Sequence, residues 1–258
     1  MRALPLKSRV ALVTGVSRRA GIGFAIAKRL ASLGVDLCLQ SFAPYDAEQS
    51  WGADKDGAET LAVELRALGV RAESVAADLA EADAPARVVA HAVERLGRLD
   101  VLVANHTHSA QGDLEALRAG EIDRHLHVNV RATLLLIQAF AARHDGRSGG
   151  RVVLLTSGQD RGPMPAELAY AASKGALASL VPSLSAHLAQ RGITVNAVDP
   201  GATDTGWASP DLHREVLARQ PQGRWGLPDD AARLIAWLAT DDARWVTGQV
   251  IHSTGGGP

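Results

Sequence analysis

Two side chains that could transfer a proton, Tyr170 and Lys174, stand four positions apart in a stretch predicted to be helical. That spacing places the phenol and the ammonium on one face of the helix, one turn apart. A free tyrosine titrates near pH ~10, but a neighbouring ammonium favours the phenolate. The pair therefore predicts a tyrosine whose pKa is lowered by Lys174 and that exchanges a proton with a substrate oxygen.

A glycine-rich turn near the N-terminus offers a second chemistry. Residues 9–14 form an apolar run typical of a strand buried on both faces, and a helical pattern covers residues 24–33. Gly15, Gly21 and Gly23 lie between the two. Such glycines let backbone N–H groups approach a pyrophosphate at the positive end of a helix. An ordinary strand-to-helix turn is the alternative, and the place of the turn in a repeating β/α pattern favours the phosphate cradle.

Length and composition fit one α/β domain. The chain has 258 residues, 47% of them hydrophobic, and 27 basic against 28 acidic residues give a formal charge of −1. That balance predicts neither a nucleic-acid-binding surface nor a polybasic membrane patch. The lone cysteine, Cys38, cannot form an internal disulfide, which predicts a reduced, cytoplasmic setting. Lys7 and Arg9 interrupt the first residues, so no signal peptide is expected, and no apolar run is long enough to predict a membrane span.

Strand and helix patterns alternate along the chain, which predicts a parallel sheet covered by helices on both faces. In such a sheet, ligands bind outside the carboxyl ends of the strands. The segment 43–57 is expected to be a surface loop, and Pro182 is expected to kink or end the helix that holds Tyr170. The expected strands cover residues 9–14, 35–42, 71–77, 99–104, 151–156, 193–198 and 247–253, and the other expected helices 58–68, 85–96, 121–144 and 228–239.

Together these motifs resemble the short-chain dehydrogenase/reductase family, and most of all its 3-oxoacyl-[acyl-carrier-protein] reductase-like members. The resemblance rests on the Tyr-x-x-x-Lys pair, on Ser157 thirteen residues before Tyr170, on the glycine turn after Thr14 and on Pro200-Gly201. It covers nearly the whole chain. It implies a single-domain Rossmann fold over residues 1–258, a doubly wound parallel sheet of about seven strands with helices on both faces, and a substrate lid at about 203–226.

The resemblance also implies an activity: an NADP(H)-dependent oxidoreductase that interconverts a small-molecule carbonyl and a secondary alcohol by hydride transfer, with 3-oxoacyl thioesters as one suggested substrate class. Tyr170 would donate the proton, and Ser157 would stabilise the oxygen on which negative charge builds. Lys174 would also bind the nicotinamide ribose, and Asn129 would hold a water linking Lys174 to solvent. Family members usually form tetramers, so a homotetramer, or else a homodimer, is implied, through the helix of Tyr170 and the last strand.

Cofactor choice depends on the end of the second strand. An acidic side chain there would bind the 2′-hydroxyl of NAD, but this chain has Gln40-Ser41-Phe42. Arg18 and Arg19 offer guanidinium groups for a phosphate, although two solvated loop arginines are the alternative. The missing acid and the two cations predict NADP(H) rather than NAD. The residues implied to hold the dinucleotide are Gly15, Ser17, Arg18, Arg19, Gly21, Ile22, Gly23, Ser41, Asp78, Leu79, Asn105, Tyr170, Lys174, Pro200, Gly201, Thr203 and Thr205.

Several residues depart from the family pattern. Five residues separate Gly15 from Gly21, where the family usually has three, and Thr107 replaces a glycine after the fourth strand. His106 and His108 could line the cleft, but surface or turn histidines are the preferred interpretation. No metal-ligand spacing is present, so no metal is predicted.

The lid segment contains Trp207 and Trp225, which predict either an apolar substrate wall or packing of the lid onto the body. Gly206, Gly223 and Gly226 are candidate hinges.

Two alternative functions stay open. The longer glycine turn suggests an enoyl reductase, although those relatives separate tyrosine and lysine by six residues rather than three. The other is a cofactor-sensing or regulatory protein with little turnover.

Overall fold

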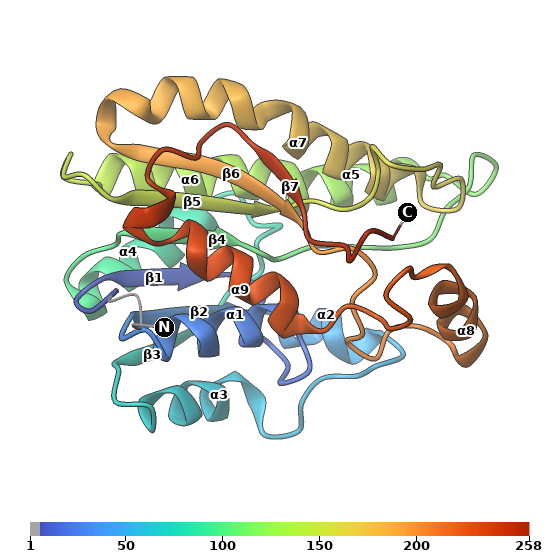
Figure 1. The fold of residues 1–258 in the computed structure, drawn as a ribbon, viewed down its shortest axis with the longest axis horizontal. Helices are drawn as coiled ribbons and strands as arrows, with labels where there is room; N and C mark the ends of the chain where they lie inside the picture. The colour runs from blue at the N-terminus through green and yellow to red at the C-terminus, as the bar shows by residue number, and fades with distance from the viewer. Residues whose placement is uncertain (1–5, 258) are drawn as a thin grey trace.

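The computed structural model describes residues 6–257, so both ends of the predicted unit 1–258 lie outside the described residues. A seven-stranded parallel sheet in the order β3-β2-β1-β4-β5-β6-β7 is covered by helices on both faces (Figure 1). The strands are β1 (Val10–Val13), β2 (Asp36–Ser41), β3 (Ala72–Ala76), β4 (Val101–Ala104), β5 (Gly150–Leu155), β6 (Ile193–Asp199) and β7 (Val250–His252). The helices are α1 (Ile22–Ala31), α2 (Ala43–Glu48), α3 (Gly57–Arg66), α4 (Ala84–Leu96), α5 (Ala119–His125), α6 (Ala132–Arg143), α7 (Leu168–Leu188), α8 (Pro210–Arg219) and α9 (Pro228–Leu238).

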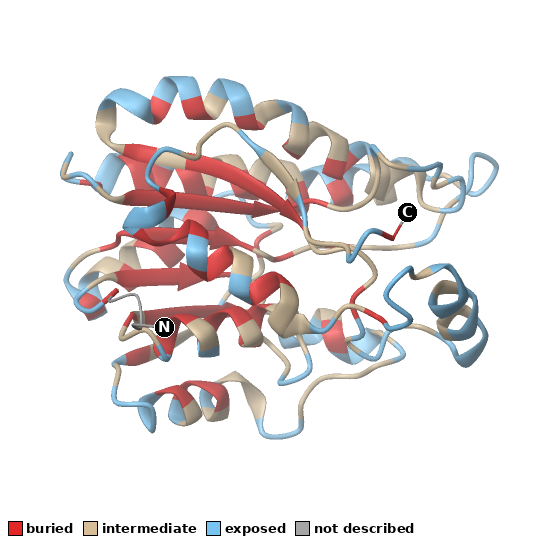
Figure 2. Cartoon of the chain, viewed as in Figure 1, coloured by how far each residue is buried: buried red, intermediate tan, exposed pale blue. Residues whose placement is uncertain are grey.

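The sheet separates two hydrophobic cores. Apolar side chains of α1, α3 and α9 pack on one face, and those of α4, α6 and α7 pack on the other. The central strands are buried on both sides, which explains why they are continuous apolar runs (Figure 2). Helix α8 has no buried residue and lies apart from both cores (Figure 2). The predicted doubly wound α/β fold is confirmed.

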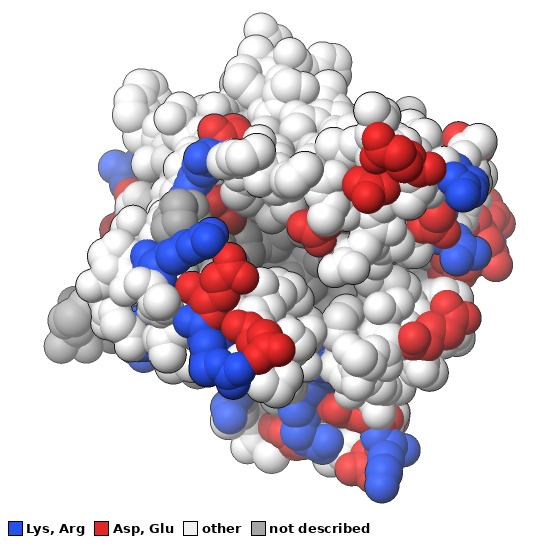
Figure 3. Space-filling view, turned by 90° about the vertical axis from the view of Figure 1, so that its right-hand side faces the viewer, with Lys and Arg blue, Asp and Glu red and all other residues white. Residues whose placement is uncertain are grey.

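The strand order reverses beside β1, between β1 and β4, and this is the place where open α/β sheets bind ligands. The carboxyl ends of the strands point to the right in Figure 1, and Figure 3 views the molecule from that side. The surface is hollowed near the centre of this face, with acidic and basic side chains around the hollow (Figure 3). Every residue expected to do chemistry comes from this end of the sheet.

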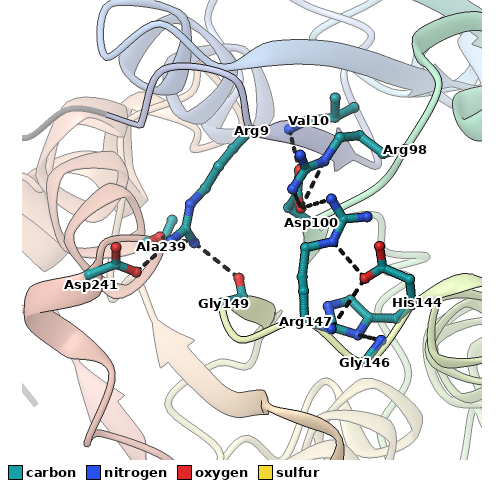
Figure 4. A network of polar contacts seen from close by, with 11 residues as sticks. Arg9, Val10, Arg98, Asp100, His144, Gly146, Arg147, Gly149, Ala239 and Asp241 are labelled. Atoms are coloured by element: carbon teal, nitrogen blue, oxygen red, sulfur yellow. Dashed lines mark hydrogen bonds and ion pairs between the residues drawn. The ribbon is translucent and has the colours of Figure 1, made fainter.

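Ion pairs and hydrogen bonds join the strands at the opposite end of the sheet (Figure 4). The Asp100 carboxylate accepts the Val10 N–H at 2.9 Å and pairs with Arg98. The Arg9 guanidinium donates to the Gly149 carbonyl at 3.0 Å and pairs with Asp241. These contacts hold the starts of β1, β4 and β5 in register, so this end of the molecule serves the fold.

Three expectations about the elements were wrong. The segment 43–57 is not all loop, because α2 forms in it and the Trp51 indole N–H bonds to Asp46 at 3.1 Å. The expected helix 121–144 is interrupted by a π-helical turn, Leu126–Arg131, between α5 and α6. Pro182 does not end α7, which continues to Leu188, so the expected early end of this helix was wrong; the proline ring is exposed, and buried neighbours hold the helix in place.

Candidate active site

Tyr170 and Lys174 lie one turn apart on α7, as the spacing predicts. The Lys174 ammonium lies 5.6 Å from the centre of the Tyr170 ring and donates a hydrogen bond to the Leu155 carbonyl at 2.9 Å. Leu155 is the last residue of β5, so this bond fixes the first turns of α7 to the carboxyl end of the sheet. The strand and the helix together place both titratable groups at the ligand-binding edge.

Burial, rather than the ammonium, dominates the acidity of Tyr170. Desolvation raises the pKa of the phenol to about 12, and the nearby Ser157 hydroxyl offsets part of the rise. Desolvation also lowers the pKa of Lys174 to about 8, against a smaller opposing effect of the Asp199 carboxylate. The expectation that Lys174 brings the Tyr170 pKa down was therefore wrong for the protein without ligands. The phenol is protonated at neutral pH, as a proton donor must be.

Asn129 lies within the π-helical turn and is fully buried. Its amide group donates to the His108 carbonyl and to the Ser173 hydroxyl, both at 2.9 Å. Its oxygen accepts the His108 N–H at 2.7 Å and the Thr107 hydroxyl at 3.3 Å. All four side-chain hydrogen-bonding positions are thus used, which leaves none for the expected water. The Ser173 hydroxyl in turn donates to the Tyr170 carbonyl at 2.8 Å, so Asn129 positions the helix turn that carries the phenol.

Ser157 follows β5 and is half-buried beside Tyr170. Its N–H donates to the Gln159 side-chain oxygen at 3.0 Å, which shapes the turn after the strand. Among the described residues, the buried Thr156 hydroxyl and Gln159 amide nitrogen have no hydrogen-bond partner. Because buried polar atoms normally have hydrogen-bond partners, these two atoms beside Ser157 and Tyr170 are suited to bind the polar groups of a ligand.

The glycine turn is shaped by close packing against the loop that follows β4. Gly15 has φ +70°, and a Cβ there would lie 2.8 Å from the His106 Cα; a Cβ at Gly23 would lie 2.6 Å from the Gly15 oxygen. The Asn105 amide donates to the carbonyls of Thr14 and Gly15 at 3.0 and 3.1 Å, so Asn105 braces the turn. No side chain in the described chain caps α1, which begins at Ile22 after Gly21. Its first N–H groups can therefore receive a pyrophosphate.

His106 lies in the loop after β4 but is buried rather than exposed, so the expectation of surface or turn histidines was wrong about the surface. Its ring bonds to the Thr14 hydroxyl at 2.7 Å and to the Val128 carbonyl at 3.0 Å. Burial lowers the pKa of His106 to about 3, which keeps the ring neutral. His108 is buried as well, and burial lowers its pKa below the ordinary range.

A cleft of about 530 Å³ opens where β2 and β3 end, on the side where a dinucleotide would place its adenosine. Ser17, Ser41 and Asp78 line it, while the side chain of Leu79 belongs to the core beneath. One Asp78 oxygen accepts the Ala80 N–H at 2.8 Å, which leaves the other free for a ligand. The size and the polar lining fit an adenosine moiety.

Neither arginine of the glycine turn is free to bind a phosphate. The Arg18 guanidinium lies 3.3 Å from the Asp46 carboxylate and 5.2 Å from the Trp51 ring centre, and it donates to the Thr205 carbonyl at 3.2 Å. Arg19 is paired with Glu64 and lies near two further carboxylates. Both arginines are therefore engaged by acidic side chains of the segment 43–57 and α3, partners that were not visible in the sequence. Their expected binding of a phosphate stays a prediction.

Helix α2 and Trp51 connect three loops around the cofactor cleft. Besides the Arg18 contacts, the Tyr45 hydroxyl both donates to the Ser109 carbonyl and accepts the Ser109 N–H, each at 3.2 Å. Ser109 belongs to the loop after β4. Sequence reasoning missed this role of α2, although two aromatic residues in a polar segment were a signal for it.

Pro200 and Gly201 follow β6 at the same edge. Gly201 has φ +65°, and a Cβ there would lie 2.9 Å from Thr254, so the turn requires glycine. Thr203 is buried, and its hydroxyl donates to the Pro200 carbonyl at 3.1 Å. Thr205 contributes the carbonyl that Arg18 binds. These four residues therefore lie where the resemblance places the nicotinamide half.

The segment 203–226 is closed at its base by a β-bridge between Thr203 and Gly226. Gly206 and Gly223 have positive φ, whereas the bridge holds Gly226, so Gly226 is not a hinge. Trp225 is buried and stacks on His213 of α8 with ring centres 4.7 Å apart, which supports the packing interpretation for this residue. Trp207 is 41% exposed and is the aromatic side chain of the segment that a substrate could meet.

One cluster beside Tyr170 was not visible in the sequence spacing. His108, Glu121 and His125 present ligand atoms within 4.8 Å of one another, a geometry that could hold a metal ion. However, the His125 Nε2 accepts the Ala110 N–H at 3.2 Å, and His108 Nε2 lies 3.0 Å from Glu121. The His125 Nδ1 lies 2.7 Å from the Glu121 carbonyl oxygen. Three of the four ring nitrogens are thus used within the protein, and these bonds hold the loop beside Tyr170 in place.

Comparisons with known proteins agree with this geometry. The family model described as Enoyl-(Acyl carrier protein) reductase matches residues 15–257. The chain is 42% identical over 252 residues to the "Uncharacterized oxidoreductase YjdA" of Bacillus subtilis (strain 168), with 97% of each protein covered. It is 33% identical over 252 residues to the 3-oxoacyl-[acyl-carrier-protein] reductase FabG of Staphylococcus aureus (strain Mu50), covering 96% of this chain and 98% of that protein. A short chain dehydrogenase from Burkholderia cenocepacia J2315 in complex with NADP superposes with a TM-score of 0.88 and 37% identity, covering 97% of this chain and 98% of that one.

Proposed function

Because this chain belongs to the short-chain dehydrogenase/reductase family, we propose that it is an NADP(H)-dependent oxidoreductase that interconverts a carbonyl and a secondary alcohol. The observation that carries the proposal is the half-buried Tyr170, protonated beside Ser157 and one turn from Lys174 at the carboxyl edge of the sheet. Separation of Tyr170 and Lys174 by three residues supports carbonyl reduction over the enoyl reduction named by the matching family description.

The bound dihydronicotinamide would supply the hydride. Tyr170 gives its proton to the substrate oxygen, and the Ser157 hydroxyl donates a hydrogen bond to that oxygen as negative charge develops on it. The Lys174 ammonium stabilises the phenolate that remains until solvent restores the proton. Asn129 acts through Ser173 and keeps the Tyr170 turn in place.

The cofactor would lie across the carboxyl ends of the strands, with its pyrophosphate on the start of α1 and its adenosine in the cleft beside Ser41. We favour NADP(H) because β2 ends in Ser41 rather than in a carboxylate that would repel a 2′-phosphate. The Burkholderia relative that binds NADP supports the same choice. Since Arg18 and Arg19 are engaged by carboxylates, a 2′-phosphate would have to displace a carboxylate from one of these arginines to bind it.

The substrate is a small molecule, and 3-oxoacyl thioesters are the first class to test, because the relative named FabG is a 3-oxoacyl-[acyl-carrier-protein] reductase. We propose that residues 203–226 form the lid over this substrate, with Trp207 available to contact it. Within the described residues no helix is both long and apolar enough to cross a membrane. The lone cysteine, Cys38, is buried, which is compatible with the reducing cytoplasm that we favour for this protein.

The deciding experiment follows oxidation of NADPH by the purified protein with a panel of 3-oxoacyl thioesters, cyclic ketones and sugars. We expect turnover with at least one class, and a loss of ~10²-fold or more in Tyr170→Phe, because the variant has no proton to give. NADPH binding, measured by its fluorescence, should persist in the variant. Undiminished turnover in Tyr170→Phe would remove the proton-donor assignment, and binding without turnover across the panel would favour a sensing role.

We also propose a homotetramer, assembled through α7 and β7 as the family resemblance implies. The edge position of β7 leaves one side of that strand unpaired in this chain, and the neighbouring Trp245 is 94% exposed. Sedimentation that finds only monomer would reject this assembly.

A further inference from the structure

A buried carboxylate lies at the same edge of the sheet as the proton-transfer pair. Asp199 is the last residue of β6, and its side chain is 1% exposed. The residue before it, Val198, pairs with Leu155 of β5, whose carbonyl binds the Lys174 ammonium. The sheet register therefore brings the Asp199 carboxylate to the same edge as Lys174.

The Asp199 carboxylate is held by groups from three segments. One oxygen accepts the Gly201 N–H at 2.8 Å. The other lies 3.0 Å from the His252 Nδ1 on β7 and 3.7 Å from the Arg161 guanidinium. These contacts compensate the buried carboxylate for the water it has lost.

This charge acts on both members of the pair. The Asp199 carboxylate raises the pKa of Lys174 against the effect of burial, and it adds to the rise in the pKa of Tyr170. His106, which faces Lys174 from the loop after β4, is neutral and cannot replace it. The other groups that face the pair are Ser157 after β5, Tyr45 of α2 and Glu167 before α7.

We propose that Asp199 is a positioning residue that keeps the Tyr170–Lys174 pair protonated, so that the proton-donating form needed for carbonyl reduction persists to higher pH. The inference rests on the proposed function. In reduction the carbonyl carbon gains the hydride, its oxygen gains the Tyr170 proton, and a phenolate remains. Oxidation reverses each transfer and needs the phenolate at the start, which a nearby carboxylate disfavours.

The test replaces the charge while preserving the contacts. In Asp199→Asn the amide oxygen can still accept the Gly201 N–H, and the amide nitrogen can donate to His252. Asp160→Asn is the matched control: Asp160 lies 3.7 Å from the other ring nitrogen of His252, but its side chain is 46% exposed. Asp199→Ser is a second uncharged variant should Asp199→Asn fail to fold.

The first measurement does not require activity. The chain has four lysines, so selective labelling of the lysine ε-carbons gives four NMR signals, and the one lost in Lys174→Arg belongs to Lys174. We expect its midpoint near about 8 in the unmodified protein, lower by ~0.5 pH unit or more in Asp199→Asn, and unchanged in Asp160→Asn. An unchanged midpoint in a folded Asp199 variant would overturn the proposal.

The second measurement compares pH–rate profiles in both directions. The alkaline limb of reduction and the acid limb of oxidation should both move to lower pH in Asp199→Asn, because the pair loses its proton more easily. Profiles that superpose on those of the unmodified protein would contradict a role in catalysis. Absence of turnover in the unmodified protein would reject the proposed function instead, and the lysine titration would still decide whether Asp199 holds the proton.

Discussion

His106 ties the glycine turn to the helix that carries Asn129, and it does so as a neutral ring. Its two nitrogens are both used, one by Thr14 and the other by the Val128 carbonyl. A charged imidazolium would have to stay in a site that water does not reach. The geometry of the cofactor turn is therefore tied to the protonation of a single buried histidine.

This burial predicts a dependence of stability on pH. The folded-state pKa of His106, about 3, lies below the ordinary value near ~6.5, so below that pH the unfolded chain binds a proton that the folded chain does not. The free energy of unfolding should therefore fall by up to ~1.4 kcal/mol per pH unit below pH ~6.5. His106→Gln lacks this contribution. We expect the free energy of unfolding of the unmodified protein to exceed that of His106→Gln by ~2 kcal/mol less at pH 5 than at pH 7, as measured by urea unfolding. If the two free energies change with pH in parallel, the buried ring is not neutral.

Ser41 provides a test of cofactor choice at one side chain. It ends β2, is almost fully buried and lines the adenosine cleft. Ser41→Asp places a carboxylate there, which should repel a 2′-phosphate and accept a bond from a free 2′-hydroxyl. We expect the Kd for NADPH to rise ~10-fold or more, and the Kd for NADH to stay level or fall. Ser41→Asn is the uncharged control, and equal losses for both cofactors in Ser41→Asp would place the 2′ position elsewhere.

At the scale of elements, α2 and Trp51 form a roof that crosses the cofactor cleft. Residues 42–44 line the adenosine cleft, Tyr45 bonds to Ser109 after β4, and Arg18 reaches from Trp51 to Thr205. A dinucleotide bound across the strand ends would lie beneath these contacts. The cofactor should then be able to leave the cleft only when the contacts of this roof open.

Weakening the roof is expected to speed cofactor release. Trp51→Ala removes both the ring under Arg18 and the bond to Asp46. Together these contacts contribute ~1.5 kcal/mol, so the dissociation rate of NADPH should rise ~10-fold. Stopped-flow fluorescence with excess unlabelled NADP measures it. Trp245→Ala, at a tryptophan outside these contacts, is the control and should not change the rate; a rate unaffected by Trp51→Ala would show that the roof does not limit release.

The elements also show where sequence reasoning succeeds. The central strands are continuous apolar runs between glycine and polar residues, so their order along the chain and the edge that carries the site could be predicted. Helix α2 and the π-helical turn could not, because both depend on contacts distant in sequence. Trp51 and Asp46 meet Arg18, and Asn129 meets Ser173 on another helix.

The same limit applies to acidity and pairing in the site. The Tyr170–Lys174 spacing correctly predicted their proximity, but the sign of the Tyr170 pKa shift depends on how completely the fold buries the phenol. Likewise, the sequence shows two arginines in the glycine turn but not the carboxylates that the fold brings to them. Residue types and their spacing in the sequence predict which side chains lie close together. Burial and ion-pair partners distant in sequence decide the charge of these side chains and whether they are free to bind a ligand.

At the scale of the whole molecule, the two ends of the sheet have separate tasks. The carboxyl ends carry Tyr170, Lys174 and the unpaired polar atoms of Thr156 and Gln159 beside them. At the amino ends, Asp100 and Arg9 bind groups of the chain itself (Figure 4). Asp100 is central to these contacts, since it is buried at 3% exposure and joins β1 to the start of β4. Mutations at this end should therefore change stability without changing the reaction.

Asp100→Ala tests this separation. It leaves the Val10 N–H without its acceptor and Arg98 without its partner, so the free energy of unfolding should fall by ~2–3 kcal/mol. Asp145→Ala is the control, because Asp145 pairs with Arg147 at this end but both side chains are solvent-accessible, at 55% and 34%, and such pairs contribute less than ~1 kcal/mol. Unfolding in urea measures both, and kcat/KM at a temperature where each variant stays folded should remain within ~2-fold of the unmodified value. A larger loss of kcat/KM in folded Asp100→Ala would contradict this separation. It would mean that a shift at the start of β4 is transmitted along the strand to the site, because a closely packed sheet is too stiff to absorb it.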